Sequence, residues 1–154
     1  MSINTGIDNR QAVADSLTKY LASTYTLYLK TQNFHWNVTG SDFYQLHLLF
    51  EKQYEDLSGA TDELAERIRA LGFRAPASFA EYLKLSTIQE EPKTVKANDM
   101  VAQLLADNQT MAREGRAVVQ VAEHVGDDAT ADMIIGRIEA HEKAAWMLRS
   151  LLEA

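Results

Sequence analysis

Apolar side chains recur every three or four residues along most of the chain, which is the spacing of one face of an α-helix. In the first half, two long segments show this pattern, roughly residues 8–36 and Phe43–Leu71. Two more follow in the second half, Val101–Ala122 and Ile134–Leu152. No stretch shows the sustained alternation of a half-buried strand. The pattern therefore predicts four long helices and an all-α fold.

The connection between the second and third helices, about residues 72–95, is unusually long and contains both prolines of the chain. Within it, the segment from Ser78 to Lys84 predicts one short helix, with Ser78 as its N-cap and Glu81 completing a capping box. One long crossover in a four-helix bundle is the arrangement of ferritin-like folds. No linker or change in composition divides the chain, so residues 1–154 are expected to form a single domain of this kind.

Composition and charge then narrow the class of protein. The 154 residues are 46% hydrophobic, too apolar for a disordered chain, and they include no cysteine, which excludes disulfide scaffolds and thiolate metal sites. The N-terminal segment lacks the apolar core of a secretory signal, and no run is long enough to span a membrane. We therefore expect a cytoplasmic protein. The formal net charge of −7 disfavours non-specific binding to nucleic acid and is compatible with attracting cations.

The second helix carries a stripe of metal-binding residue types. Relative to His47, the side chains of Glu51, Asp62 and Glu66 project at roughly 40°, 60° and 100° around the helix axis. The apolar row of the same helix lies roughly 120° away, so the stripe is expected on a flank of the bundle. The pairs His47/Glu51 and Asp62/Glu66 are about 15–20 Å apart along the axis, too far to reach one ion within a single chain.

A two-fold axis near residues 56–57 would resolve this separation. An antiparallel copy of the helix would bring His47 opposite Glu66 and Glu51 opposite Asp62, as a closed dimer requires. His35, near the end of the first helix, could join His47 across the intervening turn. Such mixed nitrogen and oxygen sites suit iron, manganese or zinc. Small residues at the crossing would allow close approach of the two helices: Ser58, Gly59 and Ala65.

Two other interpretations remain open from spacing alone. Acidic residues one helical turn apart are often solvated or paired, and Asp62 or Glu66 could simply meet Arg69. The larger ferritin-like proteins build an intrachain di-iron centre from Glu-x-x-His pairs. No glutamate of this chain has a histidine three residues later, which weighs against that type of centre.

Several motifs, taken together, resemble the Dps family of mini-ferritins. They are Asn33-Phe-His35-Trp-Asn37, then Phe43 and His47 with an acidic residue four positions on, then Asp62-Glu63-Leu-Ala-Glu66-Arg67, then Leu71-Gly72, and the run from Gly126 to Met133. The likeness extends over nearly the whole chain. It implies a homo-oligomer, a hollow dodecamer, that oxidises Fe(II), preferentially with hydrogen peroxide. The ferric mineral would be stored inside, with protection against oxidative damage.

The resemblance also assigns roles to individual residues. It implies a ferroxidase site with iron bound by His35, His47 and Glu51 of one subunit and by Asp62 and Glu66 of its two-fold mate. The position of Glu51 is often aspartate in the family, so its ligand geometry can differ here. Three further acids are implied to line pores that admit Fe(II), although helix-start chemistry is an alternative explanation for them: Glu123, Asp128 and Asp132.

A second function within the same family is a DNA-binding, nucleoid-protecting shell with weak or no ferroxidase activity. Family members that condense DNA commonly carry a lysine-rich terminal extension. In this chain the first ten residues contain one basic residue, Arg10, and the last four are Leu151-Leu-Glu-Ala154. Together with the acidic net charge, this departure predicts that DNA is not a partner.

Overall fold

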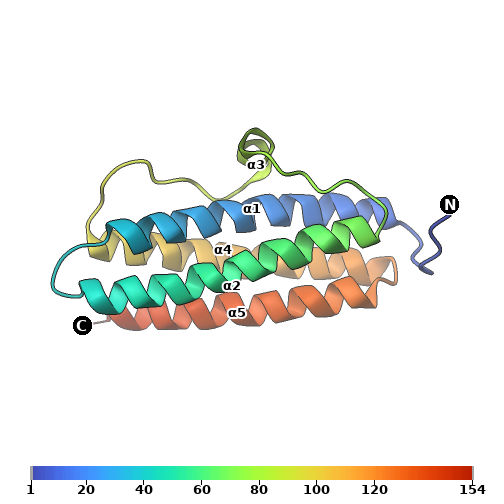
Figure 1. The fold of residues 1–154 in the computed structure, drawn as a ribbon. Coiled ribbons are helices and arrows are strands. Elements are labelled where there is room, and N and C mark those ends of the chain that lie inside the picture. Colours follow the sequence, from blue (N-terminus) through green and yellow to red (C-terminus); the bar gives the residue numbers. More distant parts are fainter. Residues whose placement is uncertain (1, 154) are drawn as a thin grey trace.

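The computed structural model describes residues 2–153, and these form five α-helices without a β-strand. The helices are α1 (Arg10–Asn37), α2 (Phe43–Ala70), α3 (Phe79–Leu85), α4 (Ala97–His124) and α5 (Asp128–Leu152) (Figure 1). The predicted four-helix bundle, with a short helix in the crossover between the second and third long helices, is confirmed. None of the described helices is both long and apolar enough to cross a membrane.

The bundle consists of two antiparallel hairpins laid side by side. A short turn joins α1 to α2, another joins α4 to α5, and α1 packs beside α4 (Figure 1). The crossover runs back along the outside of α1 to the opposite end of the bundle, and α3 packs on α1 on the way (Figure 1). Among the long helices that touch one another, α2 and α5 pack together least closely.

The apolar row of α2 faces the core as its periodicity predicts. Phe50, Leu57, Leu64 and Ile68 are all almost completely buried against the other helices. Full burial of each such side chain contributes about 1.5–3 kcal/mol relative to leaving it in water. Because this row fixes the rotation of α2 about its axis, the stripe that begins at His47 is turned toward the flank.

Side-chain caps mark where three of the helices begin, at Asn9 for α1, Ser78 for α3 and Asp127 for α5. Ser78 accepts a hydrogen bond from the Glu81 backbone N–H at 3.3 Å, so the predicted N-cap of α3 is confirmed. The Glu81 carboxylate accepts from the Ser78 hydroxyl at 2.8 Å instead of from its backbone N–H, so the reciprocal bond of the predicted capping box is absent among the described residues. Asp127 accepts from the backbone N–H of Thr130 at 3.0 Å and caps α5. Arg67, near the end of α2, donates to the same Asp127 carboxylate at 2.8 Å. These contacts join the end of α2 to the start of α5.

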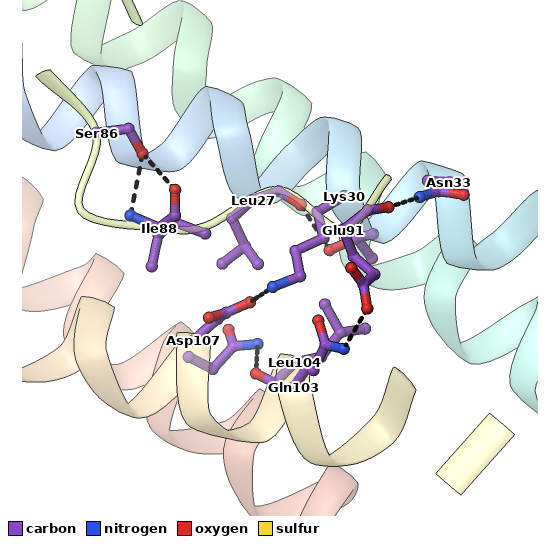
Figure 2. Close-up of polar contacts among 11 residues, drawn as sticks. Leu27, Lys30, Asn33, Ser86, Ile88, Glu91, Gln103, Leu104 and Asp107 are labelled. Atoms are coloured by element: carbon purple, nitrogen blue, oxygen red, sulfur yellow. Dashed lines mark hydrogen bonds and ion pairs between the residues drawn. The ribbon is translucent and has the colours of Figure 1, made fainter. Parts of the chain in front are cut away.

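Polar contacts also hold the crossover against α1 and α4 (Figure 2). Asn33 of α1 donates to the backbone carbonyl of Glu91 at 3.1 Å, and Gln103 of α4 donates to the Glu91 carboxylate at 3.1 Å. Beneath them, Lys30 of α1 forms an ion pair with Asp107 of α4 at 2.8 Å, with only 4% and 15% of the two side chains exposed. Burial raises the pKa of the Asp107 carboxyl, an effect that the Lys30 ammonium opposes.

Two helical glycines offer a matched pair for a packing test. A Cβ at Gly115 would lie 2.8 Å from Ile138 Cγ1 and 3.2 Å from the Tyr20 hydroxyl, whereas a Cβ at Gly136 would have no neighbour within 4 Å. We expect Gly115→Ala to lower the free energy of unfolding by about 1–3 kcal/mol through overpacking. Gly136→Ala should raise it by about 0.5–1 kcal/mol through helix propensity. Chemical denaturation of both variants measures the difference, and equal effects would contradict the packing explanation.

Candidate metal centre

The turn between α1 and α2 brings His35 and His47 into direct contact. Their rings stack with centroids 3.9 Å apart and planes 12° from parallel. Nδ1 of each ring lies 2.7 Å from the backbone carbonyl oxygen of the other. Because a carbonyl oxygen can only accept, each Nδ1 carries the proton and donates it. Each Nε2 therefore keeps its lone pair, which is the form in which histidine binds a metal.

Local sequence explains how this contact forms. Val38 is extended and ends α1, and Gly40 has φ +110°, a conformation that glycine adopts without strain. The chain thereby reverses within a few residues and α2 starts at Phe43. The Phe43 ring stacks on His47 with centroids 5.1 Å apart, which holds the imidazole from the side opposite His35.

The three predicted carboxylates lie on α2 with free oxygen atoms. Glu51 is half-buried one turn beyond His47, while Asp62 and Glu66 are exposed toward the other end of the helix. Among residues 2–153 none of the three forms an ion pair, and the Arg69 guanidinium donates instead to the Phe73 carbonyl oxygen at 3.1 Å. The alternative in which Arg69 pairs with these acids is therefore wrong.

A single copy does not bring the histidines and the distant acids together. Within the described residues, no group of three or more His, Asp, Glu or Cys side chains forms that could hold a metal ion. The surface midway along α2 is uncovered, since Ser58 and Gly59 are exposed and a Cβ at Gly59 would meet nothing within 4 Å. The helix face on which a second copy is predicted to lie is thus open, and the shared site remains a prediction.

Tyr54 is a neighbour of the histidines that the sequence analysis missed. Its ring lies 5.1 Å from the His35 ring, centroid to centroid, at 63°. Partial burial and the nearby carboxylates of Glu51 and Glu55 raise the pKa of its phenol. Tyr54 therefore lies beside two of the predicted ligands, His35 and Glu51. The signal was available, because a residue seven positions after His47 projects within about 20° of it on a helix.

The predicted pore acids surround the turn between α4 and α5. Glu123, Asp128 and Asp132 are all exposed there, whereas their neighbour Asp127 is buried and serves as the N-cap of α5. Helix capping thus accounts for Asp127 and leaves the carboxylates of the other three facing solvent. Their role in a pore remains a prediction.

The interior of the bundle holds a polar network in place of an intrachain metal centre. His141 is 1% exposed, and its Nδ1–H donates to the Asn108 side-chain oxygen at 2.8 Å. Its Nε2 accepts from the Arg137 guanidinium at 3.3 Å, and Arg137 also pairs with Asp56 at 2.9 Å. Both imidazole nitrogens are therefore occupied, which gives His141 a structural role. The adjacent guanidinium would repel a metal ion.

This network makes stability depend on pH. Burial, and then the Arg137 charge, lower the pKa of His141 from 6.5 to about 3. Between these values the unfolded chain binds a proton that the folded chain excludes, so stability is complete above pH 6.5 and falls as the pH drops. We expect a loss of about 1.4 kcal/mol per pH unit over this range. Denaturation at fixed protein concentration measures it, and His141→Gln should remove this contribution to the slope.

Comparison with known proteins agrees with the fold and the motifs. Residues 14–154 match the family model of the ferritin-like domain. The DNA protection during starvation protein of Porphyromonas gingivalis is 38% identical, over 94% of this chain and 92% of its own length. The crystal structure of a Dps protein from Bacillus brevis superposes with a TM-score of 0.91 at 38% identity, covering 94% and 97% of the two chains.

A third solved structure, a Dps protein from Vibrio cholerae O1, is described as a member of the ferritin-like diiron-carboxylate proteins. It superposes with a TM-score of 0.90 at 33% identity, over 94% of this chain and 91% of that one. These matches span almost the full length of both partners. The chain therefore belongs to the ferritin-like superfamily and, within it, to the Dps family.

Proposed function

We propose that this protein stores iron and protects against oxidative damage by oxidising Fe(II) with hydrogen peroxide. The site is shared between two copies of the chain, with His35, His47 and Glu51 from one and Asp62 and Glu66 from the other. Twelve copies form a hollow shell that retains the ferric product. Membership of the Dps family supports iron chemistry in general, and the local geometry supports this particular site.

The observation that carries the proposal is the reciprocal pair of hydrogen bonds between His35 and His47. Each backbone carbonyl fixes the tautomer and orientation of the opposite ring, as hydrogen bonds to the ring N–H do for metal-binding histidines. His35 is buried and His47 half-buried, and a purely structural role would not need both Nε2 atoms free. Glu51, one helical turn from His47, adds the first oxygen donor.

Iron is the substrate of this reaction, and the protein positions it. Two Fe(II) ions give one electron each to peroxide, which takes up two protons and becomes two water molecules. Carboxylate oxygens stabilise the Fe(III) that forms, because hard anionic ligands favour the more highly charged ion. The imidazole Nε2 atoms hold Fe(II) in place before oxidation.

Exposed apolar side chains at one end of the bundle support assembly. Figure 1 shows that the end of α1, the start of α2 and the end of α5 meet at this end. Large apolar groups of this kind gathered on one surface are typical of subunit interfaces. Between 38% and 67% of each side chain is exposed in a single copy: Trp36, Phe43, Tyr44, Leu48, Trp146, Leu151 and Leu152.

The direct test is anaerobic loading with Fe(II) followed by peroxide or by air, with native mass spectrometry of the same preparation. We expect rapid oxidation by peroxide, slow oxidation by air, and the mass of twelve subunits. Glu51→Ala should slow the peroxide reaction, whereas Glu63→Ala, on the same helix but off the stripe, should not. Equal rates for the two variants would overturn the site, and a different mass would overturn the shell.

DNA binding is the alternative activity within the family, and we expect it to be absent. With a formal net charge of −7 per chain, an assembled shell repels phosphate groups over most of its surface. A gel-shift assay at moderate salt should show no retardation of duplex DNA. Retarded DNA together with no peroxide-driven oxidation would favour the DNA-binding function instead.

A further inference from the structure

Three tyrosines form a continuous line of rings that begins at the proposed metal site. Tyr54 of α2 contacts His35, with ring centroids 5.1 Å apart. Tyr28 of α1 follows at 6.0 Å from Tyr54, and Tyr25, one turn earlier on α1, at 5.5 Å from Tyr28. Tyr25 lines a cleft of about 420 Å³ between α1, α3 and the crossover. The line therefore connects the histidine pair to an opening on another side of the bundle.

The hydroxyl groups of these three rings are not held in a short hydrogen bond within the chain. Among the described residues, Tyr54 and Tyr25 have no hydrogen-bond partner for the phenol oxygen, and Tyr28 has only a long contact of 3.4 Å from Gln32. The three rings are half-buried, and the phenol oxygens of Tyr54 and Tyr25 are not among the buried polar atoms without a partner, so they are open to solvent. A phenol, unlike a benzene ring, gives up an electron and a proton to form a stable radical.

Two other tyrosines are not suited to this step. Tyr82 stacks on Tyr25 with centroids 5.0 Å apart, but its hydroxyl donates to the Pro76 carbonyl at 2.6 Å. Tyr20 in the core likewise donates to the Met111 carbonyl at 3.0 Å. The phenolic proton of each is held in a hydrogen bond to the backbone, whereas Tyr54, Tyr28 and Tyr25 donate to no group among the described residues, so the line ends at Tyr25.

We propose that Tyr54, Tyr28 and Tyr25 form a redox relay that carries an oxidising equivalent from the metal site to the cleft. This proposal rests on the proposed function, which supplies Fe(II) and peroxide. It applies when only one Fe(II) occupies the site, because peroxide then lacks its second electron and would release a hydroxyl radical. The relay supplies that electron from within the protein.

Fe(II) gives one electron and Tyr54 gives one electron and its phenolic proton, and with one further proton from solvent peroxide becomes two water molecules. The Tyr54 radical then takes an electron and a proton from Tyr28, and the Tyr28 radical takes them from Tyr25. At the cleft, a second Fe(II) ion gives its electron to the Tyr25 radical, which regains a proton from water. Glu90, also at the cleft, favours the approach of that cation.

The first experiment loads the shell anaerobically with about one Fe(II) per site and adds peroxide with a nitroso spin trap. Peptide mass spectrometry then locates the trapped radicals. Tyr54→Phe should lower the adducts at Tyr25 about tenfold, because a phenylalanine ring does not give up an electron and a proton as the phenol does. Tyr44→Phe is the control and should leave the Tyr25 adducts unchanged, since Tyr44 is 67% exposed and contacts none of these rings.

A pattern of adducts that follows exposure, heaviest at Tyr44 and unaffected by Tyr54→Phe, would overturn the relay and indicate free hydroxyl radicals. If wild-type protein does not oxidise Fe(II) with peroxide at all, the proposed function fails. The relay is then decided by the second experiment, which uses no iron.

The second experiment exploits the absence of cysteine from the chain. Leu83→Cys introduces a single thiol on α3, where Leu83 is 54% exposed and lines the same cleft as Tyr25. A ruthenium polypyridyl label on this thiol, photo-oxidised in the presence of an electron acceptor, should oxidise Tyr25 and produce trapped radicals at Tyr54. Tyr28→Phe should lower the Tyr54 adducts about tenfold by breaking the line. Equal adducts in both proteins would overturn the relay.

Discussion

Shells assembled from equal amounts of two inactive variants should recover about a quarter of the wild-type rate of Fe(II) oxidation by peroxide. One variant lacks the histidines, as His35→Ala with His47→Ala, and the other lacks the distant acids, as Asp62→Ala with Glu66→Ala. Each alone should lose at least about 100-fold, since changes even to outer-shell partners of metal ligands cost 10–100-fold.

The recovery follows from how a two-fold interface combines the copies. A mixed interface contains one copy of each variant and two sites. One site combines the missing histidines of the first copy with the missing acids of the second and is inactive. The other site combines the intact histidines of the second copy with the intact acids of the first and is complete. Random mixing makes half of the interfaces mixed, which gives about a quarter of all sites complete. Recovery requires unfolding and refolding the two chains together. Preformed shells that are merely mixed serve as the control.

This design separates the shared site from any site within one chain. If His35, His47, Asp62 and Glu66 acted within a single copy, no mixture would restore oxidation. If the acids were only structural, the second variant would already be active by itself. Native mass spectrometry of the refolded mixture confirms that both variants have entered the same particles.

Removing one partner of the buried pair between Lys30 and Asp107 should produce the largest loss of stability. Asp107→Ala leaves the Lys30 ammonium, 4% exposed, without an opposite charge, and we expect the free energy of unfolding to fall by about 3–5 kcal/mol. The pair joins α1 to α4, whereas the crossover is held to α4 separately by Glu91 and Gln103 (Figure 2). Urea denaturation at fixed subunit concentration provides the measurement.

Two further variants identify burial as the cause. Replacing both partners, as Lys30→Met with Asp107→Leu, should restore most of the loss, because no charge is then left buried. The exposed pair of Arg116 and Glu142, with 57% and 53% of the side chains accessible, is the matched control. Glu142→Ala there should cost less than about 1 kcal/mol. A similar loss at both pairs would contradict the explanation from burial.

The sequence predicted the helices because each one has a repeating apolar face. It was least informative where small residues are buried. The large apolar residues of the last helix begin at Met133, yet α5 starts at Asp128, because Thr130 and Ala131 pack into the core without contributing to a pattern of large side chains. The start of α4 at Ala97 also precedes Val101, and its first turn contributes one large buried residue, Met100.

At the candidate site, helix geometry sufficed to place His47, Glu51, Asp62 and Glu66 on one flank of α2, because residue spacing fixes direction around a helix. Local motifs likewise indicated that His35 lies near His47. The same arithmetic could have included Tyr54, whose type did not suggest a ligand. That two copies complete the site is an inference from the distance along the helix, and it awaits the mixing experiment.

By itself, the sequence determined the all-α bundle, its long crossover and the stripe of possible ligands, since all three follow from local periodicity and spacing. Only the tertiary structure decided how the two imidazoles exchange hydrogen bonds with each other's backbone, because that depends on the turn joining α1 and α2. The line of tyrosine rings has the same origin. Tyr54 and Tyr28 lie far apart in the chain and meet only because α1 and α2 pack against each other.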